Sequence, residues 1–380
     1  MKIAGIIAEY NPFHKGHEYQ VNLLREQGYE GIVVVMSGNF VQRAETAMAD
    51  KYRRAECAVL GGADLVLELP LPYAVASAED FGLGGISLLS ATGVVDTVCC
   101  GSESGDEKNR RQYKALCDAE KSGKIKEKMQ MGLSYPAACR EAVTELGKVW
   151  SDEANDVLAL AYRKALDKID SKMHLLAIDR KGSFYGDGSE GFESAHSIRR
   201  RLLDGEDVSS SLPESTEKLL KHAPFSQWKT MERGILAYYR TADPRELEEF
   251  YGMREGLAQR ICAASDAPDL ETLYERVKTK RFPHSAVRRA VLCGYLKLPK
   301  ALPNLTYLRV LAFNEKGQEI LKKMKKTATL PILSSFSGEQ KNDELAQLQL
   351  RGDEIFALTL ETPETRYKDC TESARKICQK

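Results

Sequence analysis

The chain has 380 residues, 43% of them apolar, which is enough to bury a core and to build about two or three domains. Lysine plus arginine and aspartate plus glutamate both number 55, so attraction to a polyanion has to come from local segregation of charge. No apolar run is long enough to span a membrane, the amino terminus lacks a signal-peptide pattern, and the nine cysteines show no zinc-ligand spacing. We therefore expect a cytoplasmic protein with reduced thiols, no metal site and no membrane contact.

The first part of the chain alternates strand-like and helix-like segments. Short, continuous apolar runs begin near residues 3, 31, 65 and 94, with helical patterns between them. Such runs are typical of strands buried on both faces of a parallel sheet, so we expect an α/β fold with a Rossmann-like sheet. Ligands bind such sheets at the carboxyl ends of the strands. The candidate loops are "EYNPFHKGH", "SGNFVQR", "ELPLPYAVASAED" and "GSESGD".

Further along the chain, a charged helical stretch over 106–151 and a helix near 154–168 lead to a last predicted strand, "HLLAI", at 174–178. A glycine-rich loop and a short arginine-rich helix follow it. The stretch "VSSSLPEST", residues 208–216, is the best linker in the sequence. We expect a catalytic domain over 1–207 and a mostly helical domain over 217–380, with a little strand formed by "LPILSSFSG" and "IFALTLET" near its end.

The loop after the first strand carries His14, Gly16 and His17 where a helix is expected to start. A helix N-terminus presents unpaired backbone N–H groups that suit phosphate, and glycine lets the backbone approach a ligand closely. The two histidines can then donate hydrogen bonds to phosphate oxygens as charge develops on them. The alternative is a turn whose imidazoles face solvent. Position after the first strand favours a phosphate-binding corner.

A basic segment lies in the distal half, between Arg281 and Lys326. It holds eleven lysines and arginines against two glutamates, a net charge of +9, with Phe282 and Tyr307 among the interleaved aromatic residues. Cations for phosphates and aromatic rings for bases are typical of RNA binding, whereas a solvated helix pair with its aromatic residues in the core is the alternative. Our candidates for tRNA contact are Arg281, Arg288, Arg289, Lys322, Lys323 and Lys325.

Two motifs in this order resemble the nucleotidyltransferase superfamily. They are "NPFHKGH", which is similar to its His-X-Gly-His signature, and "ESAHSIR", which is similar to its second signature. More closely, "VMSGNFVQRAE", "GADLVLELPLPYAVASAEDF", "REGLAQRI" and "LRVLAFNEKGQEILKKM" resemble the bacterial tRNA(Met) cytidine acetate ligase family over nearly the whole chain. The resemblance implies that ATP and acetate form acetyl-adenylate, with magnesium as the metal that accompanies ATP. The acetyl group then passes to N4 of the wobble cytidine of elongator tRNA(Met).

The resemblance also implies roles for residues that match the family motifs. His14 and His17 would be catalytic. The residues that it implies for ATP binding are Ile7, Ala8, Glu9, Tyr10, Asn11, Pro12, Phe13, His14, Lys15, Gly16, His17, Gln20, Gly101, Asn155 and Arg180. Ser197 and Arg199 of the second motif are further candidates for ATP binding, because a guanidinium at a helix start opposite the phosphate corner can hold phosphates; the alternative for Arg199 is a solvated helix face. The chain departs from the family around Asn155, where it has Ala-Asn-Asp, and after Arg180, where it has "KGSFYGD". An alternative role for Asn155 is that of a plain helix cap. An alternative role for Glu9 is to accept hydrogen bonds from the backbone.

Two other functions fit the residues without the resemblance. A small-metabolite adenylyltransferase or cytidylyltransferase would use the same corner but leave the basic segment idle. A nucleotide- or RNA-binding protein without catalysis would need neither histidine. The sequence does not define the oligomeric state or the acetate pocket.

Overall fold

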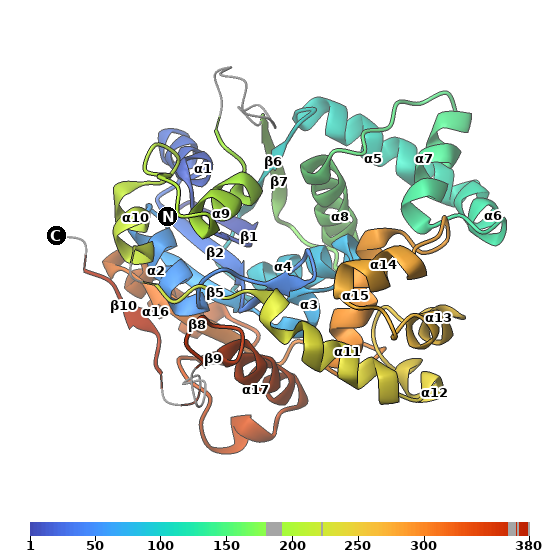
Figure 1. The fold of residues 1–380 in the computed structure, drawn as a ribbon. Coiled ribbons are helices and arrows are strands. Elements are labelled where there is room, and N and C mark those ends of the chain that lie inside the picture. The colour runs from blue at the N-terminus through green and yellow to red at the C-terminus, as the bar shows by residue number, and fades with distance from the viewer. Residues whose placement is uncertain (180–191, 222, 364–369, 371, 379–380) are drawn as a thin grey trace.

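The computed structural model describes residues 1–179, 192–221, 223–363, 370 and 372–378, and centres them on one mainly parallel sheet (Figure 1). The strand order is β10-β8-β5-β2-β1-β6-β7, with β9 paired to β8 and with β3 and β4 in a separate hairpin. The strands are β1 Ile3–Ala8, β2 Gly31–Ser37, β3 Phe40–Val41, β4 Glu45–Thr46, β5 Leu65–Leu69, β6 Thr97–Ser102, β7 His174–Asp179, β8 Leu308–Phe313, β9 Ile332–Leu333 and β10 Arg375–Lys376.

Five of these strands are the apolar runs predicted from the sequence. Strands β5, β2, β1, β6 and β7 pair in parallel in that order, which confirms the Rossmann-like α/β class. Their runs are continuous because both faces are covered: Val33 and Val35 of β2 belong to one core cluster, and Val34 and Met36 belong to another. The carboxyl ends of these five strands therefore meet at one edge of the sheet.

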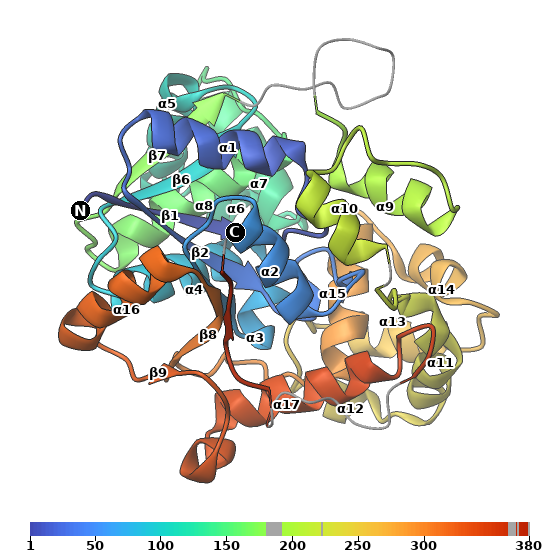
Figure 2. The same ribbon diagram turned by 90° about the vertical axis from the view of Figure 1, so that its left-hand side faces the viewer.

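Helices cover both faces of this sheet (Figure 2). Side chains of α1 and α2 enter the core on one face, and side chains of α4 and α8 enter the core on the other. Helices in the first half are α1 Lys15–Glu26, α2 Lys51–Leu60, α3 Leu71–Ala74, α4 Ala78–Ala91, α5 Asp106–Lys121, α6 Lys124–Gln130, α7 Tyr135–Glu145, α8 Ala154–Lys168 and α9 Ala195–Leu203. Helices in the second half are α10 Glu214–Leu220, η1 Trp228–Met231, α11 Glu232–Thr241, α12 Pro244–Leu247, α13 Leu257–Ala263, α14 Leu270–Val277, α15 His284–Tyr295, α16 Glu315–Thr327, η2 Gly338–Asn342 and α17 Glu344–Ala357.

Strand β8 was not predicted, because the sequence favoured helices up to about residue 326. The run "LRVLAF" pairs antiparallel with β5 and lies buried in the sheet. A short apolar run fits a buried strand and a buried helix equally well, so its periodicity does not decide between them. Near the end of the chain, "LPILSS" does contain the short strand β9, but "IFALTLET" begins inside α17, so the expectation of a strand there was wrong.

The second half forms its own apolar cluster of helices and also joins the first half. Leu257, Leu273 and Val287 are among the buried residues of that cluster, which lies within α11 to α15. The sheet continues across the expected boundary, since β8 of the second half pairs with β5 of the first half and β10 pairs with β8. The division into domains 1–207 and 217–380 stays a prediction.

The stretch 208–216, expected to be a linker, packs onto the first half. Val208 and Leu212 are 4% and 2% exposed and share a cluster with Met48 and Ile198. The backbone N–H of Lys15 donates to the carbonyl of Ser211 at 3.1 Å. This stretch therefore covers the start of α1.

All nine cysteines lie within the described residues and are free thiols, as the sequence indicated. None of the described helices combines the length and the hydropathy that crossing a bilayer requires.

Candidate active site

The corner after β1 turns the chain from the carboxyl edge of the sheet into α1. Tyr10 adopts a positive φ of 45°, and the peptide bond between Asn11 and Pro12 is cis. The rings of Tyr10 and Phe13, both buried, meet edge to face with centroids 4.9 Å apart, and Asn11 Oδ1 accepts from the N–H of Met48 at 2.8 Å. These contacts fix where α1 begins, so that its N-terminal N–H groups lie at the edge where ligands bind.

His14 is the N-cap of α1, and its ring stacks on that of His17 with centroids 3.7 Å apart. Nδ1 of His14 accepts from the N–H of Gly16 at 3.0 Å, and Nδ1 of His17 accepts from the N–H of His14 at 3.3 Å. Because Nδ1 accepts in both rings, each neutral imidazole carries its proton on Nε2. The backbone thus orients both rings as Nε2–H donors. The alternative of solvent-facing imidazoles is wrong for His14, which is 6% exposed.

Gly16 is required by the fold of the corner itself. A Cβ atom at this position would lie 2.8 Å from Cε1 and 3.0 Å from Nδ1 of His14, closer than real Cβ contacts. The His14 ring folds over the first turn of α1 and occupies the space of a side chain. The glycine between the histidines therefore allows the ring stack to form.

Other residues of this loop have partners within the protein. Ile7 and Ala8 end strand β1. Lys15 Nζ donates to the carbonyl of Ser210 at 2.7 Å, and Gln20 Nε2 donates to the carbonyl of Cys99 on β6 at 3.4 Å. A nucleotide contact for Lys15 and Gln20 stays a prediction.

Gly101 lies near the carboxyl end of β6 and borders open space, because a Cβ there would meet no atom within 4 Å. Asn155 lies close by, in the first turn of α8, where its Nδ2 donates to Oε1 of Glu103 at 2.5 Å. Glu153 is the N-cap of this helix, so the reading of Asn155 as its cap was wrong. The sequence candidates Gly101 and Asn155 are thus joined through the loop "GSESGD".

Asp156 holds that loop against α8, a role that the sequence did not indicate. Its carboxylate accepts from the hydroxyls of Ser102 at 2.5 Å and Ser151 at 2.7 Å and from the N–H of Ser104 at 3.2 Å. Burial by itself raises the pKa of Asp156, but these hydrogen bonds outweigh it and leave the pKa below its ordinary value of 3.8. The ionised carboxylate therefore fixes the loop beside Gly101.

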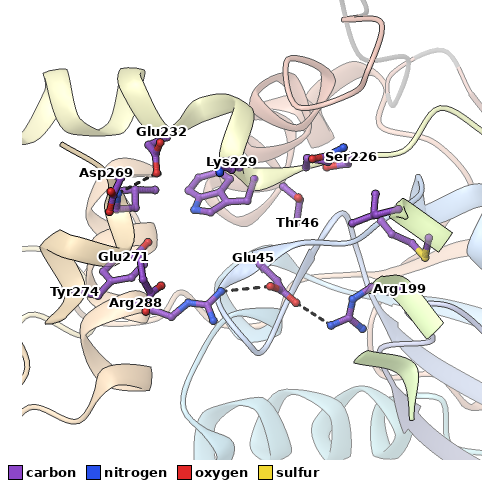
Figure 3. Close-up of a pocket in the computed structure, with 15 residues that line it drawn as sticks. Glu45, Thr46, Arg199, Ser226, Lys229, Glu232, Asp269, Glu271, Tyr274 and Arg288 are labelled. Carbon is purple, nitrogen blue, oxygen red and sulfur yellow. Dashed lines mark hydrogen bonds and ion pairs between the residues drawn. The ribbon is translucent and has the colours of Figure 1, made fainter. Parts of the chain in front are cut away.

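Arg199 reaches the corner from α9. Its Nη1 donates to the carbonyl of Asn11 at 2.7 Å, and its Nη2 pairs with Oε1 of Glu45 at 3.1 Å (Figure 3). Burial lowers its pKa, against the opposing effect of Glu45 and Glu9. Ser197 donates its hydroxyl to Glu193 at 2.6 Å. Arg180 lies outside the described residues.

Glu9 is the carboxylate of the corner. Its Oε1 accepts from the N–H of Gln42 at 2.9 Å, so the reading as an acceptor from the backbone is confirmed. Burial raises the pKa of Glu9, and the nearby cations Arg43 and Arg199 oppose the shift. Two cations, Arg43 and Arg199, thus lie near Glu9, where they can offset phosphate charge.

Arg54 of α2 holds the corner in place and was missed from the sequence. It is fully buried and donates to the carbonyls of Glu9 at 2.6 Å, Ala49 at 2.9 Å and Ser37 at 3.1 Å, and also to that of Gly38. It therefore ties the ends of β1 and β2 together. No local signal distinguishes this arginine from a solvated one in the helical pattern "KYRRAE".

The basic segment is divided between two places in the fold. On α15, Arg288 pairs with Glu45 at 3.3 Å, and Arg289 donates to the carbonyls of Val75 at 3.0 Å and Gln42 at 3.3 Å. Helix α15 thus lies at the carboxyl edge of the sheet. Arg281, just before it, is exposed and pairs with Glu255 at 3.5 Å.

Helix α16 lies at the opposite, amino edge of the sheet, where Thr327 donates to the carbonyl of Thr92 at 3.0 Å (Figure 1). Its residues Lys322, Lys323 and Lys325 are exposed. Two aromatic residues of the basic segment, Phe282 and Tyr307, are 4% and 3% exposed and belong to the core, so a stacking role for these two was wrong.

A parallel sheet whose first strand leads into a buried His-X-Gly-His helix cap defines a class of nucleotidyl-transfer enzymes. The sequence profile of the family described as HIGH Nucleotidyl Transferase matches residues 1–370, so the chain belongs to that class.

Relatives narrow the class further. A tRNA(Met) cytidine acetate ligase of Fervidobacterium nodosum is 36% identical over 369 residues, which cover 89% of this chain and 84% of the relative. One of Syntrophomonas wolfei is 35% identical over 403 residues, with 96% and 97% covered. The crystal structure of Thermotoga maritima TmcAL bound with alpha-thio ATP matches with a TM-score of 0.89 at 30% identity, and both chains are covered in full. The chain belongs to the tRNA(Met) cytidine acetate ligase family.

Proposed function

We propose that this protein joins acetate to the wobble cytidine of elongator tRNA(Met) at the expense of ATP. Its relatives carry the name of this ligase, and the solved relative was crystallised with alpha-thio ATP. The single observation that carries the proposal is the stacked pair His14 and His17 at the N-terminus of α1, held with both Nε2–H groups as donors.

The first step activates acetate. An acetate oxygen bonds to the α-phosphorus of ATP, the bond from that phosphorus to the bridging oxygen breaks, and pyrophosphate leaves. His14 and His17 stabilise the charge that develops on the phosphate oxygens, and the positive end of the α1 dipole adds to this effect. Arg199 is a largely buried cation beside the corner and can hold the departing phosphates.

The second step transfers the acetyl group. The N4 amine of cytidine bonds to the acetyl carbonyl carbon, the bond from that carbon to the adenylate oxygen breaks, AMP leaves, and the nitrogen releases a proton to solvent. Carboxylates are poor acyl donors and the cytosine amine is a weak nucleophile, so two moderate steps replace one difficult step.

Magnesium fits the corner as a companion of ATP. Mg²⁺ keeps several waters and binds through one or two carboxylates together with substrate phosphates. Glu9 supplies one carboxylate at the strand end, with Oε1 already accepting from the N–H of Gln42. Bound there, the ion would offset phosphate charge, a task that Arg43 and Arg199 share.

The test follows an isotopic label from acetate in the presence of ATP, magnesium and elongator tRNA(Met). We expect label on N4 of one anticodon cytidine, release of AMP and pyrophosphate, and acetate-dependent pyrophosphate–ATP exchange without RNA. A uridine at that position, which lacks the amine, abolishes transfer but leaves the exchange intact. Exchange that ignores acetate would favour a small-metabolite nucleotidyltransferase, and no ATP consumption would favour a binding protein. Label reaching RNA only from acetyl-CoA would refute the ligase mechanism.

A further inference from the structure

A cavity of about 740 Å³ lies beside the corner, between the β3–β4 hairpin and the helices of the second half (Figure 3). Glu45 and Arg199 line it from the first half. Trp228, Lys229, Tyr274 and Arg288 line it from the second half. Both halves of the chain are therefore needed to build it, and its volume is in the range of small-molecule sites.

Glu45 joins this cavity to the corner. Its Oε1 pairs with Arg199 at 3.1 Å and its Oε2 pairs with Arg288 at 3.3 Å, as Figure 3 shows. Arg199 in turn donates to the carbonyl of Asn11, three residues before His14. A ligand in the cavity that contacts Glu45 thus lies next to the loop that is proposed to bind ATP.

The charges of the cavity do not suit a polyanion. Its lining residues include four carboxylates, Glu45, Glu232, Asp269 and Glu271, and three cations, Arg199, Lys229 and Arg288. A triphosphate would meet more anions than cations there. A neutral ligand with a flat face and polar edges fits this balance, because carboxylates accept from amines and cations donate to carbonyl oxygens.

An aromatic surface is available for such a face. The indole of Trp228 is half-buried and is held edge to face by Phe40 and Tyr295, with centroids 6.0 and 6.1 Å apart. Nucleobases stack on fixed aromatic rings of this kind in proteins that bind single-stranded nucleic acid. Arg288 lines the cavity, and its guanidinium is a donor for an acceptor on a bound base.

We propose that this cavity binds the target cytidine of the RNA, with the base against Trp228 and its exocyclic amine toward Glu45. The inference rests on the proposed function and adds the place where the acceptor nucleotide sits. Glu45 is the carboxylate of the cavity that also holds Arg199, so an amine bound to it lies on the side of the corner. Carboxylates select cytosine over uracil, because the cytosine amine donates and the uracil oxygen does not.

A binding experiment tests the cavity without catalysis. The chain has two tryptophans, and Trp150 does not line the cavity. The variant Trp150→Phe therefore leaves Trp228 as the single reporter. The probes are anticodon stem-loops of elongator tRNA(Met) with cytidine, uridine or an abasic site at the wobble position. We expect the cytidine probe to quench Trp228 emission, the uridine probe to bind about tenfold more weakly and the abasic probe to leave the emission unchanged. The proposal is overturned if all three probes quench Trp228 emission equally. It is also overturned if no probe quenches the emission although anisotropy shows that the probes bind.

A kinetic experiment uses a matched pair of variants. Trp228→Leu should lower the ratio of acetyl transfer to pyrophosphate exchange by about tenfold or more, since it removes a stacking surface for the acceptor. Arg276→Gln, an exposed residue that pairs with Asp266 outside the cavity, should leave both rates unchanged. If the unsubstituted protein lacks acetate-dependent exchange, the proposed function fails. If it has exchange and Trp228→Leu keeps the ratio, only the cavity assignment fails. Should Trp228→Leu not fold, the fluorescence experiment decides.

Discussion

Among single residues, His14 carries two tasks that can be separated by substitution: it caps α1 and it offers Nε2–H to the site. Asparagine is a good N-cap but lacks a second donor at the position of Nε2. We expect His14→Asn to keep the thermal stability of the protein while lowering acetate-dependent pyrophosphate exchange by roughly 10² to 10³ fold, the usual cost of losing a donor to transition-state charge. His17→Ala should lower exchange similarly.

The control for this pair is His174→Ala, at the exposed amino end of β7 and so at the opposite edge of the sheet. It should leave both exchange and stability unchanged. Near-normal exchange in the double variant of His14 and His17 would contradict the assignment and return these residues to a purely structural role in the turn.

The junction of the β6 loop with α8 depends on ionised Asp156, whose pKa lies below its ordinary value. A lowered pKa adds stability above the unfolded-state value of about 3.8, and this stability is lost as pH falls through the folded-state pKa. We expect Asp156→Asn to destabilise the protein at pH 7 by about 1–3 kcal/mol, since it weakens several hydrogen bonds to a charged group. The difference in the free energy of unfolding between the two proteins should shrink once the pH falls below the folded-state pKa of Asp156.

Urea unfolding at neutral and acidic pH measures this difference. Asp152→Asn changes an exposed carboxylate four residues away and serves as the control, with little effect expected at either pH. A destabilisation of Asp156→Asn that is equal at both pH values would mean that the hydrogen bonds of this side chain do not depend on the charge of the carboxylate.

In the whole molecule, the two basic regions lie at opposite edges of the sheet: α15 beside the cavity and α16 at the amino ends of the strands. An anticodon stem-loop is much smaller than a complete tRNA. We expect Lys322→Gln, Lys323→Gln and Lys325→Gln combined to weaken binding of complete tRNA. The log–log salt slope of that binding should fall by about 0.9 for each duplex phosphate that a lysine no longer neutralises. Binding of the stem-loop should be unchanged.

Affinities of both RNAs at several salt concentrations measure these effects. Arg288→Gln is the counterpart, since it should weaken both RNAs to a similar extent. If the triple lysine variant binds complete tRNA normally, α16 is a solvated surface. If it loses both RNAs equally, the stem-loop reaches the amino edge and the proposed arrangement is wrong.

Several features of the fold and the site followed from local sequence. The sequence predicted five strands of the sheet, β1, β2, β5, β6 and β7. Continuous apolar runs that alternate with helical patterns are typical of strands in a sheet covered on both faces. The pair His14 and His17 was predictable because a helix cap and its third following residue are neighbours in the chain, so their contact is set by the geometry of one helical turn.

Other features were decided by the tertiary structure. Strand β8 is a short apolar run that could equally be buried as a helix, and its pairing with β5 settled the matter. Glu45 meets Arg199 and Arg288 across sequence separations of 154 and 243 residues, and Arg54 meets carbonyls at the ends of two strands. The charge of a side chain is visible in the sequence, but its partner depends on how distant segments pack. For the same reason, one basic segment became two surfaces at opposite edges of the sheet, because β8 carries the chain across the sheet between α15 and α16.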